Sequence, residues 1–398
     1  MTDLLTLEDL DPASLRGVRV FVRVDYNVPL AQGKVADATR LEESLPTLRE
    51  LRSAGARLLL ASHCGRPKGA PDPRYSLRPV AAALGELLGA PVQFAEDCVG
   101  EPARRAAAAL ADGEVCLLEN LRYHAGEEQS DPGFAAELAA LAEAYVGDAF
   151  GSAHRAHASV VGVPERLRRR AAGRLLVKEV RALGRLLAAP EKPFAALLGG
   201  AKIEDKIETL ENLLPRLHIL MVGGGMANTF LAAGGHDLGA SLVERPRLDT
   251  ARDILERARA AAIEVFLPVD LVATDDLASP RRIETVSVDR LPPGLKAVDV
   301  GPATRHAFAA AVARARTLFW NGPLGVFEKP PFDEGTRALA AAVADCPGFT
   351  VVGGGETVAA VRQAGMLGRI GHVSTGGGAA LEFLAGKTLP GVAVLERR

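Results

Sequence analysis

Short apolar runs recur along the whole chain, and they constrain its fold more than any other feature. Each run spans a few residues, is rich in Val, Leu, Ile or Phe, and ends near polar residues or glycines. The runs cover residues 18–25, 56–63, 114–120, 144–150, 193–200, 218–225, 264–270, 296–301, 317–323 and 349–355. Continuous apolar strands of this kind are typical of parallel sheets that are buried on both faces.

Helical stretches fill the gaps between these runs. They are expected at residues 47–54, 135–144, 203–213, 249–262, 303–315 and 336–344. Strands that alternate with helices favour an α/β architecture. Because the runs outnumber the strands of one ordinary sheet, we expect two doubly wound, Rossmann-like parallel-sheet domains.

An amphipathic segment near the middle of the chain marks the expected domain boundary. The apolar residues that share one helical face are Leu176, Val180, Leu183 and Leu187. We therefore expect an interdomain helix over residues 173–188, between an N-terminal domain of residues 1–172 and a C-terminal domain of residues 189–387.

Charge and composition limit the classes of partner. With 47 Lys+Arg against 49 Asp+Glu, the chain has no global positive field that would attract a polynucleotide. No window reaches the ~18 apolar residues of a membrane span, and the acidic N-terminus does not resemble a signal peptide. Four scattered cysteines without a C-x-x-C pair fit a reduced cytoplasmic protein. We expect a cytoplasmic protein that binds neither nucleic acid nor membrane.

Arginines and histidines follow the apolar runs of the first half. Open parallel sheets bind ligands at the carboxyl ends of their strands, where these side chains would converge. They are Arg23, Asp25, Asn27, Arg40, His63, Arg66, Arg122, His154, Arg155 and His157. Converging guanidinium groups suit a small, highly anionic ligand and would repel a metal ion. For any single arginine, an interdomain ion pair or a helix cap is an equal alternative.

Glycine-rich turns follow the runs of the second half, at residues 197–202, 221–228, 320–323, 351–357 and 374–380. Glycine lets backbone N–H groups approach phosphate oxygens, and a following helix adds its positive end. Lys202 and Lys206 are expected on the first turn of one helix, where both ammonium groups would neutralise a transferring phosphoryl group. Leu381 occupies the first Gly position of a Walker A loop, and no G-x-G-x-x-G is present. A different glycine-rich arrangement is expected to hold the nucleotide.

Ten motifs occur in a fixed order over essentially the whole chain: RVDYNVP, ADATR, SHCGRP, ENLRYH, FGSAHRAH, GGAKIEDK, GGGMANTF, WNGPLGVFE, GGGET and STGGGA. Together they resemble the phosphoglycerate kinases. The resemblance implies a usually monomeric enzyme of glycolysis and gluconeogenesis. Such an enzyme uses Mg²⁺ and reversibly transfers a phosphoryl group from 1,3-bisphosphoglycerate to ADP, which yields 3-phosphoglycerate and ATP. The resemblance also implies a phosphoglycerate-binding N-terminal domain, a nucleotide-binding C-terminal domain, and the return of residues 388–398 to the first domain.

The resemblance assigns roles residue by residue. The phosphoglycerate would contact Asp25, Asn27, Arg40, His63, Arg66, Arg122 and Arg155. The nucleotide would contact Lys202, Lys206, Asn321, Glu328, Gly354, Gly355, Glu356 and Thr357. Arg40, Lys202 and Lys206 would be catalytic. Glu356 would hold the metal at a position where the family often has Asp, and Cys64, Ser152 and Ala380 are further departures from the family's motifs.

The implied acceptor is a carboxylate, which is already ionised at neutral pH, so no general base is expected. Transfer would rest on in-line positioning and charge stabilisation when the domains close. The histidines would position groups or bind anions, and for His154 and His157 a purely structural role is equally open. Two alternatives are a different small-molecule kinase or ligase, and a non-catalytic nucleotide-binding protein. The latter would be expected to have lost Lys202, Arg40 or the glycine turns.

Overall fold

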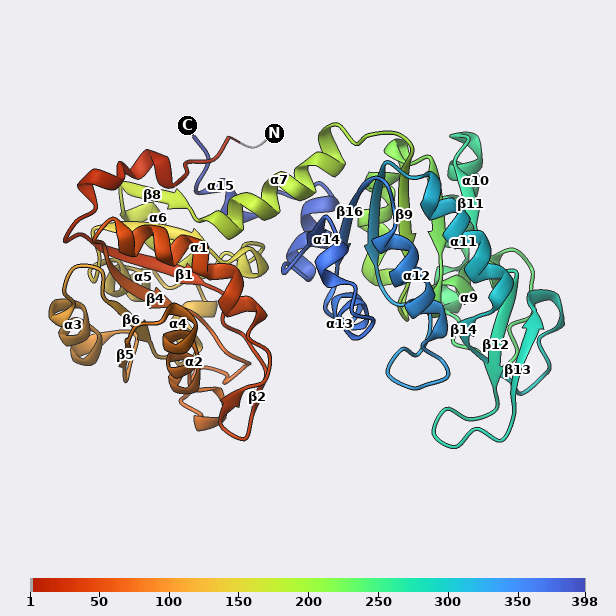
Figure 1. Cartoon of the computed structure of the whole chain (residues 1–398), viewed down its shortest axis with the longest axis horizontal. Helices are drawn as coiled ribbons and strands as arrows, with labels where there is room; N and C mark the ends of the chain where they lie inside the picture. Colours follow the sequence, from red (N-terminus) through yellow and green to blue (C-terminus); the bar gives the residue numbers. More distant parts are fainter. Residues whose placement is uncertain (1–2, 398) are drawn as a thin grey trace. The chain divides into compact units, whose positions relative to one another are not determined.

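A computed structural model describes residues 3–397 and divides the chain into two compact units (Figure 1). Unit 1 comprises Met1–Arg181 and Thr388–Arg398, and unit 2 comprises Ala182–Lys387. The division falls within helix α7 (Arg174–Ala188). Each unit is built on its own six-stranded parallel sheet, which confirms the predicted α/β class. Among the described residues, no helix is long and apolar enough to cross a membrane.

The sheet of unit 1 places β1 and β4 near its centre. Its strands, in sheet order, are β5 (Val92–Ala95), β6 (Val115–Leu118), β4 (Arg57–Ala61), β1 (Arg19–Val24), β7 (Ala144–Asp148) and β8 (Arg169–Ala172). All five neighbouring pairs run parallel. The carboxyl ends of β1, β4, β6 and β7 therefore lie at one edge of the sheet, where the loops that carry the predicted anion ligands begin.

Helices cover the sheet of unit 1 and bury its strands. They are α1 (Thr39–Ser53), α2 (Arg78–Leu88), α3 (Gly100–Ala109), α4 (Ala125–Glu128), α5 (Pro132–Ala139) and α6 (Val163–Arg166). One face of β1 packs its valines against leucines of α1 and α2. On the opposite face, the rings of Phe21 and Tyr145 stack at 6.1 Å. Burial on both faces explains why these strands read as continuous apolar runs.

The C-terminal segment completes unit 1. The backbone N–H of Leu5 donates to the carbonyl of Leu395 at 2.8 Å, and that of Arg397 donates to the carbonyl of Asp3 at 2.9 Å. The short helix α15 (Pro390–Ala393) is held by the N–H of Gly391, which donates to the carbonyl of Ala153 at 2.9 Å. The two ends of the chain are therefore joined in one unit.

The sheet of unit 2 has β9 and β15 at its centre. Its strands, in sheet order, are β11 (Glu264–Phe266), β10 (Ile219–Val222), β9 (Phe194–Leu198), β15 (Thr317–Asn321), β16 (Phe349–Gly353) and β17 (His372–Val373). Its helices after α7 are α8 (Ile207–Leu213), α9 (Gly224–Ala233), α10 (Leu248–Ala260), α11 (Pro302–Arg314), α12 (Glu334–Ala344), α13 (Gly355–Gln363) and α14 (Gly378–Leu384). The buried Trp320 packs in a core formed with α11 and α12.

Three expectations about the elements were wrong. The helix expected at 135–144 ends early, because α5 ends at Ala139 and Ala144 begins β7. The run at 296–301 was expected in a parallel sheet, but β14 (Lys296–Val300) pairs antiparallel with β12 (Asp270–Thr274), which also pairs with β13 (Ile283–Ser287). The run at 264–270 is also interrupted: β11 ends at Phe266, Pro268 lacks a backbone donor, and β12 begins at Asp270. Helix α1 begins eight residues earlier than expected because the Asp37 carboxylate accepts hydrogen bonds from Thr39 at its first turn.

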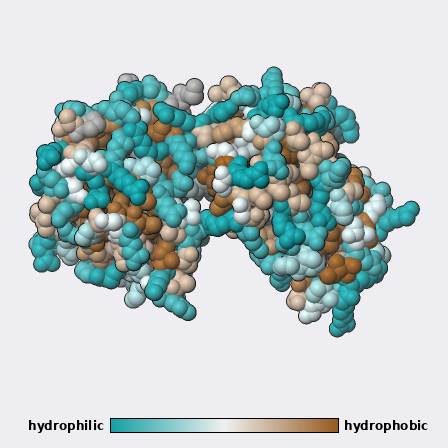
Figure 2. Space-filling view, in the orientation of Figure 1, coloured by the Kyte–Doolittle hydropathy of each residue, from teal (hydrophilic) through white to brown (hydrophobic). Residues whose placement is uncertain are grey.

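The visible face of each unit is mostly hydrophilic, and its hydrophobic side chains gather in small patches (Figure 2). The apolar residues of the strands are accordingly found in the two cores. The few charged side chains that do lie inside unit 1 therefore need a specific explanation.

Candidate active site

The loop after β1 carries the first ion pair of the site. Arg40, at the start of α1, donates from Nη1 to the Asp25 carboxylate at 2.9 Å. Burial pushes the pKa of Asp25 upward, but the positive charge of Arg40 and further neighbours outweigh it and hold the pKa below its usual range. Asn27 lies exposed beside this pair, and its side-chain oxygen accepts the N–H of Gly65 at 2.9 Å. The loops after β1 and β4 are thereby tied together.

A buried arginine to which the resemblance assigned no role lies at the centre of this site. The Arg23 side chain is only 1% exposed, donates to Ser159 at 2.8 Å, and lies 4.0 Å from the Glu127 carboxylate. One of its terminal nitrogens lies 3.3 Å from Nδ1 of His63. The signal was a charged residue inside the otherwise apolar strand RVFVRV, a placement that needs a buried partner.

Two further arginines, Arg122 and Arg155, act on His63 through their charges. Arg122, in the short turn Leu121–Tyr123 after β6, is buried and donates to the Gly65 carbonyl at 2.9 Å. Arg155 follows β7 and donates to a ring nitrogen of its neighbour His154 at 3.2 Å. Arg66 lies exposed one residue beyond Gly65. The predicted anion ligands therefore come from loops after β1, β4, β6 and β7, at one edge of the sheet.

Burial and the charges of these loops lower the pKa of two histidines. Burial, together with the charges of Arg23, Arg122 and Arg155, lowers the pKa of His63 well below its usual value. Burial and the same arginines lower the pKa of His157 to about 3. Carboxylates already lie against three of the arginines: Asp25 against Arg40, Glu127 against Arg23 and Glu128 against Arg122. A small anion could accept hydrogen bonds from the guanidinium donors that these pairs leave free.

In unit 2, the loops after β9 and β15 approach each other backbone to backbone. Gly322 has a φ of 100°, and a Cβ placed on it would lie 2.2 Å from the carbonyl oxygen of Gly199. The N–H of Gly200 donates to the Pro323 carbonyl at 2.7 Å. Only glycine permits this contact, so the glycines of both turns have a structural reason as well as the predicted phosphate role.

Asn321 ends β15 and offers an unused donor. Its side chain is 4% exposed, and Nδ2 is buried with no hydrogen-bond partner among residues 3–397. A Cβ on Gly354, whose φ is 90°, would lie 2.9 Å from this nitrogen. Thr357 is fully buried and its hydroxyl accepts the N–H of Gly322 at 2.6 Å, so its side chain supports the loop. The amide of Asn321 therefore lies against the turn that begins α13.

The expectation that Lys202 and Lys206 share the first turn of a helix was wrong. Lys202 lies exposed in a loop, whereas Lys206 ends a 3-10 turn (Glu204–Lys206) and is 8% exposed. The backbone N–H of Ile203 donates to the Glu244 carboxylate, which holds the segment out of a regular α-helix. Burial lowers the pKa of Lys206, against the opposing charges of Asp205 and Glu356.

A cavity of about 300 Å³ opens beside these glycine loops. Its walls include the backbone at Gly200 and Gly225 and the apolar side chains of Leu242 and Leu324. Two carboxylates that were predicted to contact the nucleotide, Glu328 and Glu356, also line it. A mostly apolar cleft with a few polar groups is the usual form of a small-molecule site.

Asp299 lines the same cavity and was missed from sequence. Its carboxylate accepts the backbone N–H of Gly335 at 2.7 Å and that of Val300 at 2.8 Å. Burial raises its pKa to about 7 despite these bonds. The motif VDVG contains no signal that would separate this aspartate from an ordinary strand-end residue.

The chain is similar to known proteins over nearly its full length. A family model described as phosphoglycerate kinase matches residues 7–387. A phosphoglycerate kinase of Thermus thermophilus is 58% identical over 98% of this chain and 99% of the relative. One of Desulforudis audaxviator is 54% identical over 99% of each. The solved phosphoglycerate kinases of Coxiella burnetii and Pyrococcus horikoshii OT3 both have a TM-score of 0.87, at 39% and 33% identity, and each match covers 98% of both chains.

Proposed function

The chain belongs to the phosphoglycerate kinase family and is a phosphotransferase, and from this premise we propose a division of labour between its two units. Unit 1 binds 3-phosphoglycerate or 1,3-bisphosphoglycerate, and unit 2 binds ADP or ATP with Mg²⁺. The enzyme transfers the phosphoryl group between them in line and without a general base. The observation that carries the proposal is the positive charge of Arg23, Arg122 and Arg155, which converges on His63 in unit 1.

The phosphoglycerate side of the proposal rests on that charge. Arg23 and Arg122 are nearly inaccessible to water, so an anion bound beside them interacts in a medium of low effective dielectric. Arg40, a third exposed and already oriented by Asp25, is able to reach a ligand with its remaining donors. Asn27, Arg66 and Arg155 supply further donors around the same loops.

The nucleotide side rests on the cavity of unit 2. Its apolar walls suit a base and sugar, and the exposed Glu328 carboxylate suits ribose hydroxyls. Asn321 Nδ2 and the backbone N–H groups at the start of α13 suit phosphate oxygens. We expect Gly354, Gly355 and Thr357 to take part through their backbone.

The residues present also fit Mg²⁺. Glu356 is exposed at the first turn of α13 and lines the cavity, and its charge acts on buried Lys206. A single carboxylate that works together with substrate phosphates is a usual way to hold this ion. When bound, the ion would neutralise charge on the phosphates.

No residue needs to remove a proton in this reaction, because a carboxylate acceptor is ionised at neutral pH. Arg40 and Lys202 would stabilise charge on the migrating group, and Lys206 would do the same from a partly dehydrated position. We further propose that a movement of the units brings the two substrates together and excludes water. We also propose that the enzyme acts as a monomer in the cytoplasm, where its four free cysteines would stay reduced.

A coupled assay with 3-phosphoglycerate and Mg-ATP tests the proposed function. We expect turnover by the intact chain, and a loss of at least about a hundredfold in kcat for Lys202→Ala and Arg40→Ala. Lys34→Ala, a change at an exposed lysine of the β2–β3 hairpin (Leu30–Ala31 and Lys34–Val35), is the matched control and should retain activity.

Nucleotide binding without turnover would refute the kinase reaction and favour a non-catalytic nucleotide-binding protein. Turnover with another phosphate acceptor, but not with 3-phosphoglycerate, would favour a different small-molecule kinase. Activity that persists in EDTA would refute the requirement for Mg²⁺.

A further inference from the structure

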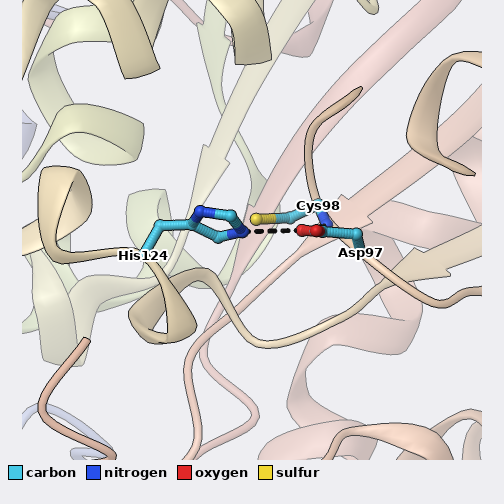
Figure 3. Close-up of side chains that lie close together, drawn as sticks. All are labelled: Asp97, Cys98 and His124. Carbon is cyan, nitrogen blue, oxygen red and sulfur yellow. Dashed lines mark hydrogen bonds and ion pairs between the residues drawn. The ribbon is translucent and has the colours of Figure 1, made fainter. Parts of the chain in front are cut away.

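Three side chains with metal-ligating atoms meet in unit 1, outside the proposed substrate site. They are Asp97, Cys98 and His124, and one ligand atom of each lies within 4.8 Å of the other two. Figure 3 shows the imidazole of His124 facing the Asp97 carboxylate, with the Cys98 sulfur beside the same ring nitrogen. That nitrogen, Nε2, lies 2.7 Å from Asp97 Oδ1.

The fold brings these residues together through neighbouring strands. Asp97 and Cys98 follow the edge strand β5, and His124 follows β6 and the turn that carries Arg122. Because β5 and β6 pair in parallel, their carboxyl ends present both loops at the same edge of the sheet. The cluster therefore has a position in the sheet where ligand sites commonly form.

Two of the three groups are held in place by the protein. Asp97 Oδ1 accepts the backbone N–H of Cys98 at 2.6 Å, which closes a tight turn and orients the carboxylate. The His124 ring stacks on Phe134 with 5.3 Å between centroids. Groups fixed in this way lose little conformational freedom when they bind an ion.

We propose that Asp97, Cys98 and His124 form a binding site for Zn²⁺. Thiolate, imidazole and carboxylate are the three side-chain ligands that this ion takes, and a site with three protein ligands keeps a water in the fourth position. The Asp97 and His124 side chains are 40% and 33% exposed, which leaves an open side for the ion and its water. Cys98 is fully buried and closes the inner side.

The required rearrangement is small. Tetrahedral Zn²⁺ with bonds of about 2.0–2.3 Å separates its ligands by roughly 3.3–3.7 Å. The ion would lie between His124 Nε2 and Asp97 Oδ1, so these two atoms, now 2.7 Å apart, would separate by less than about 1 Å. The Cys98 sulfur already lies within 4.8 Å of a ligand atom of each.

Two carboxylates act on the Cys98 thiol. Burial and the charges of Asp97 and the buried Glu127 raise the pKa of Cys98 above its usual value. The same two carboxylates attract a divalent ion.

Titration of Co²⁺ into the EDTA-treated full chain, without nucleotide, tests the proposal. Cobalt reports its own ligands, because a bound thiolate gives a charge-transfer band in the near ultraviolet and tetrahedral geometry gives intense visible bands. We expect one Co²⁺ per chain with both features. Equimolar Zn²⁺ should abolish them, because Zn²⁺ accepts tetrahedral geometry without a ligand-field preference.

Variants assign the spectrum to the cluster. Cys98→Ser should abolish the charge-transfer band, and His124→Gln should weaken Co²⁺ binding by about tenfold or more. Cys116→Ser, a change at another buried cysteine of unit 1, is the matched control and should keep the wild-type spectrum. The measurement on the unmodified chain stands even if a variant fails to fold. Absence of the band there, its survival in Cys98→Ser, or Co²⁺ that Zn²⁺ does not displace would overturn the proposal.

Discussion

Asp148 at the end of β7 makes the stability of unit 1 depend on pH. Its carboxylate is fully buried, and Oδ1 accepts the N–H groups of Leu175 and Leu176 at 2.9 and 3.2 Å, at the start of α7. The neighbouring N–H of Arg174 is satisfied by the Thr47 hydroxyl at 2.8 Å. Oδ2 is buried and accepts no hydrogen bond from residues 3–397. Burial raises the pKa of Asp148 to about 7.

The perturbation is Asp148→Asn, which keeps the accepting oxygen and removes the titration. In the unfolded chain this carboxyl has a pKa of about 3.9, so folding raises its pKa and the folded state holds the proton more tightly. Stability therefore falls as the pH rises from about 4 to about 7. At about 1.4 kcal/mol per pH unit, the free energy of unfolding should drop by about 3 kcal/mol between pH 5 and pH 8 because of this group.

Urea unfolding, followed by far-ultraviolet circular dichroism at pH 5 and pH 8, measures this drop. We expect the wild-type chain to lose about 3 kcal/mol more than Asp148→Asn over this interval. The difference between the wild-type drop and the Asp148→Asn drop cancels the contributions of all groups that titrate alike in both proteins, including Asp299. Asp249→Asn, at a 95% exposed side chain, is the control and should keep the wild-type dependence. An equal drop in wild type and Asp148→Asn would refute the reasoning.

Three further outcomes are expected. Asn321→Ala should raise KM for ATP by about tenfold or more, with little change in the free energy of unfolding, because Nδ2 has no hydrogen-bond partner among residues 3–397. An unchanged KM would contradict the phosphate role. Gly322→Ala should destabilise unit 2 by about 3 kcal/mol in thermal unfolding, since its Cβ would lie 2.2 Å from a carbonyl oxygen. The control Gly368→Ala places its Cβ in open space and should leave the stability nearly unchanged. His157→Gln should leave the pH profile of kcat/KM unchanged between pH 5 and 8, because the pKa of His157 is about 3. If the variant lost the fall in kcat/KM on the acidic side of the profile, this imidazole would titrate in that range.

The alternation of strands and helices was readable because it is a local property. Buried parallel strands must be apolar throughout, so runs such as RVFVRV were recognisable without their neighbours. The strand β13, whose residues are alternately exposed and partly buried, carries no such run and was missed. The polar side chains after the strands followed from the same logic, because parallel strands end at a common edge.

The environment of each site residue was not readable, because burial and charge depend on contacts between distant segments. Sequence spacing suggested that Lys202 and Lys206 are equivalent, yet one is exposed in a loop and the other is buried after a 3-10 turn held by Glu244. Arg23 became central only when the fold placed it against Ser159 and Glu127.

The sequence by itself determined the α/β class, the order of the motifs and the chemical types of the ligands, because these are properties of short segments. Only the tertiary structure decided which of those groups are dehydrated, which histidines have a lowered pKa, and that Asp97, Cys98 and His124 meet at one edge of a sheet. The physical reason is that the pKa of a side chain and the meeting of ligand atoms depend on what lies within a few ångströms in space. Residues 98 and 124 are distant along the chain and become neighbours only through the pairing of β5 with β6.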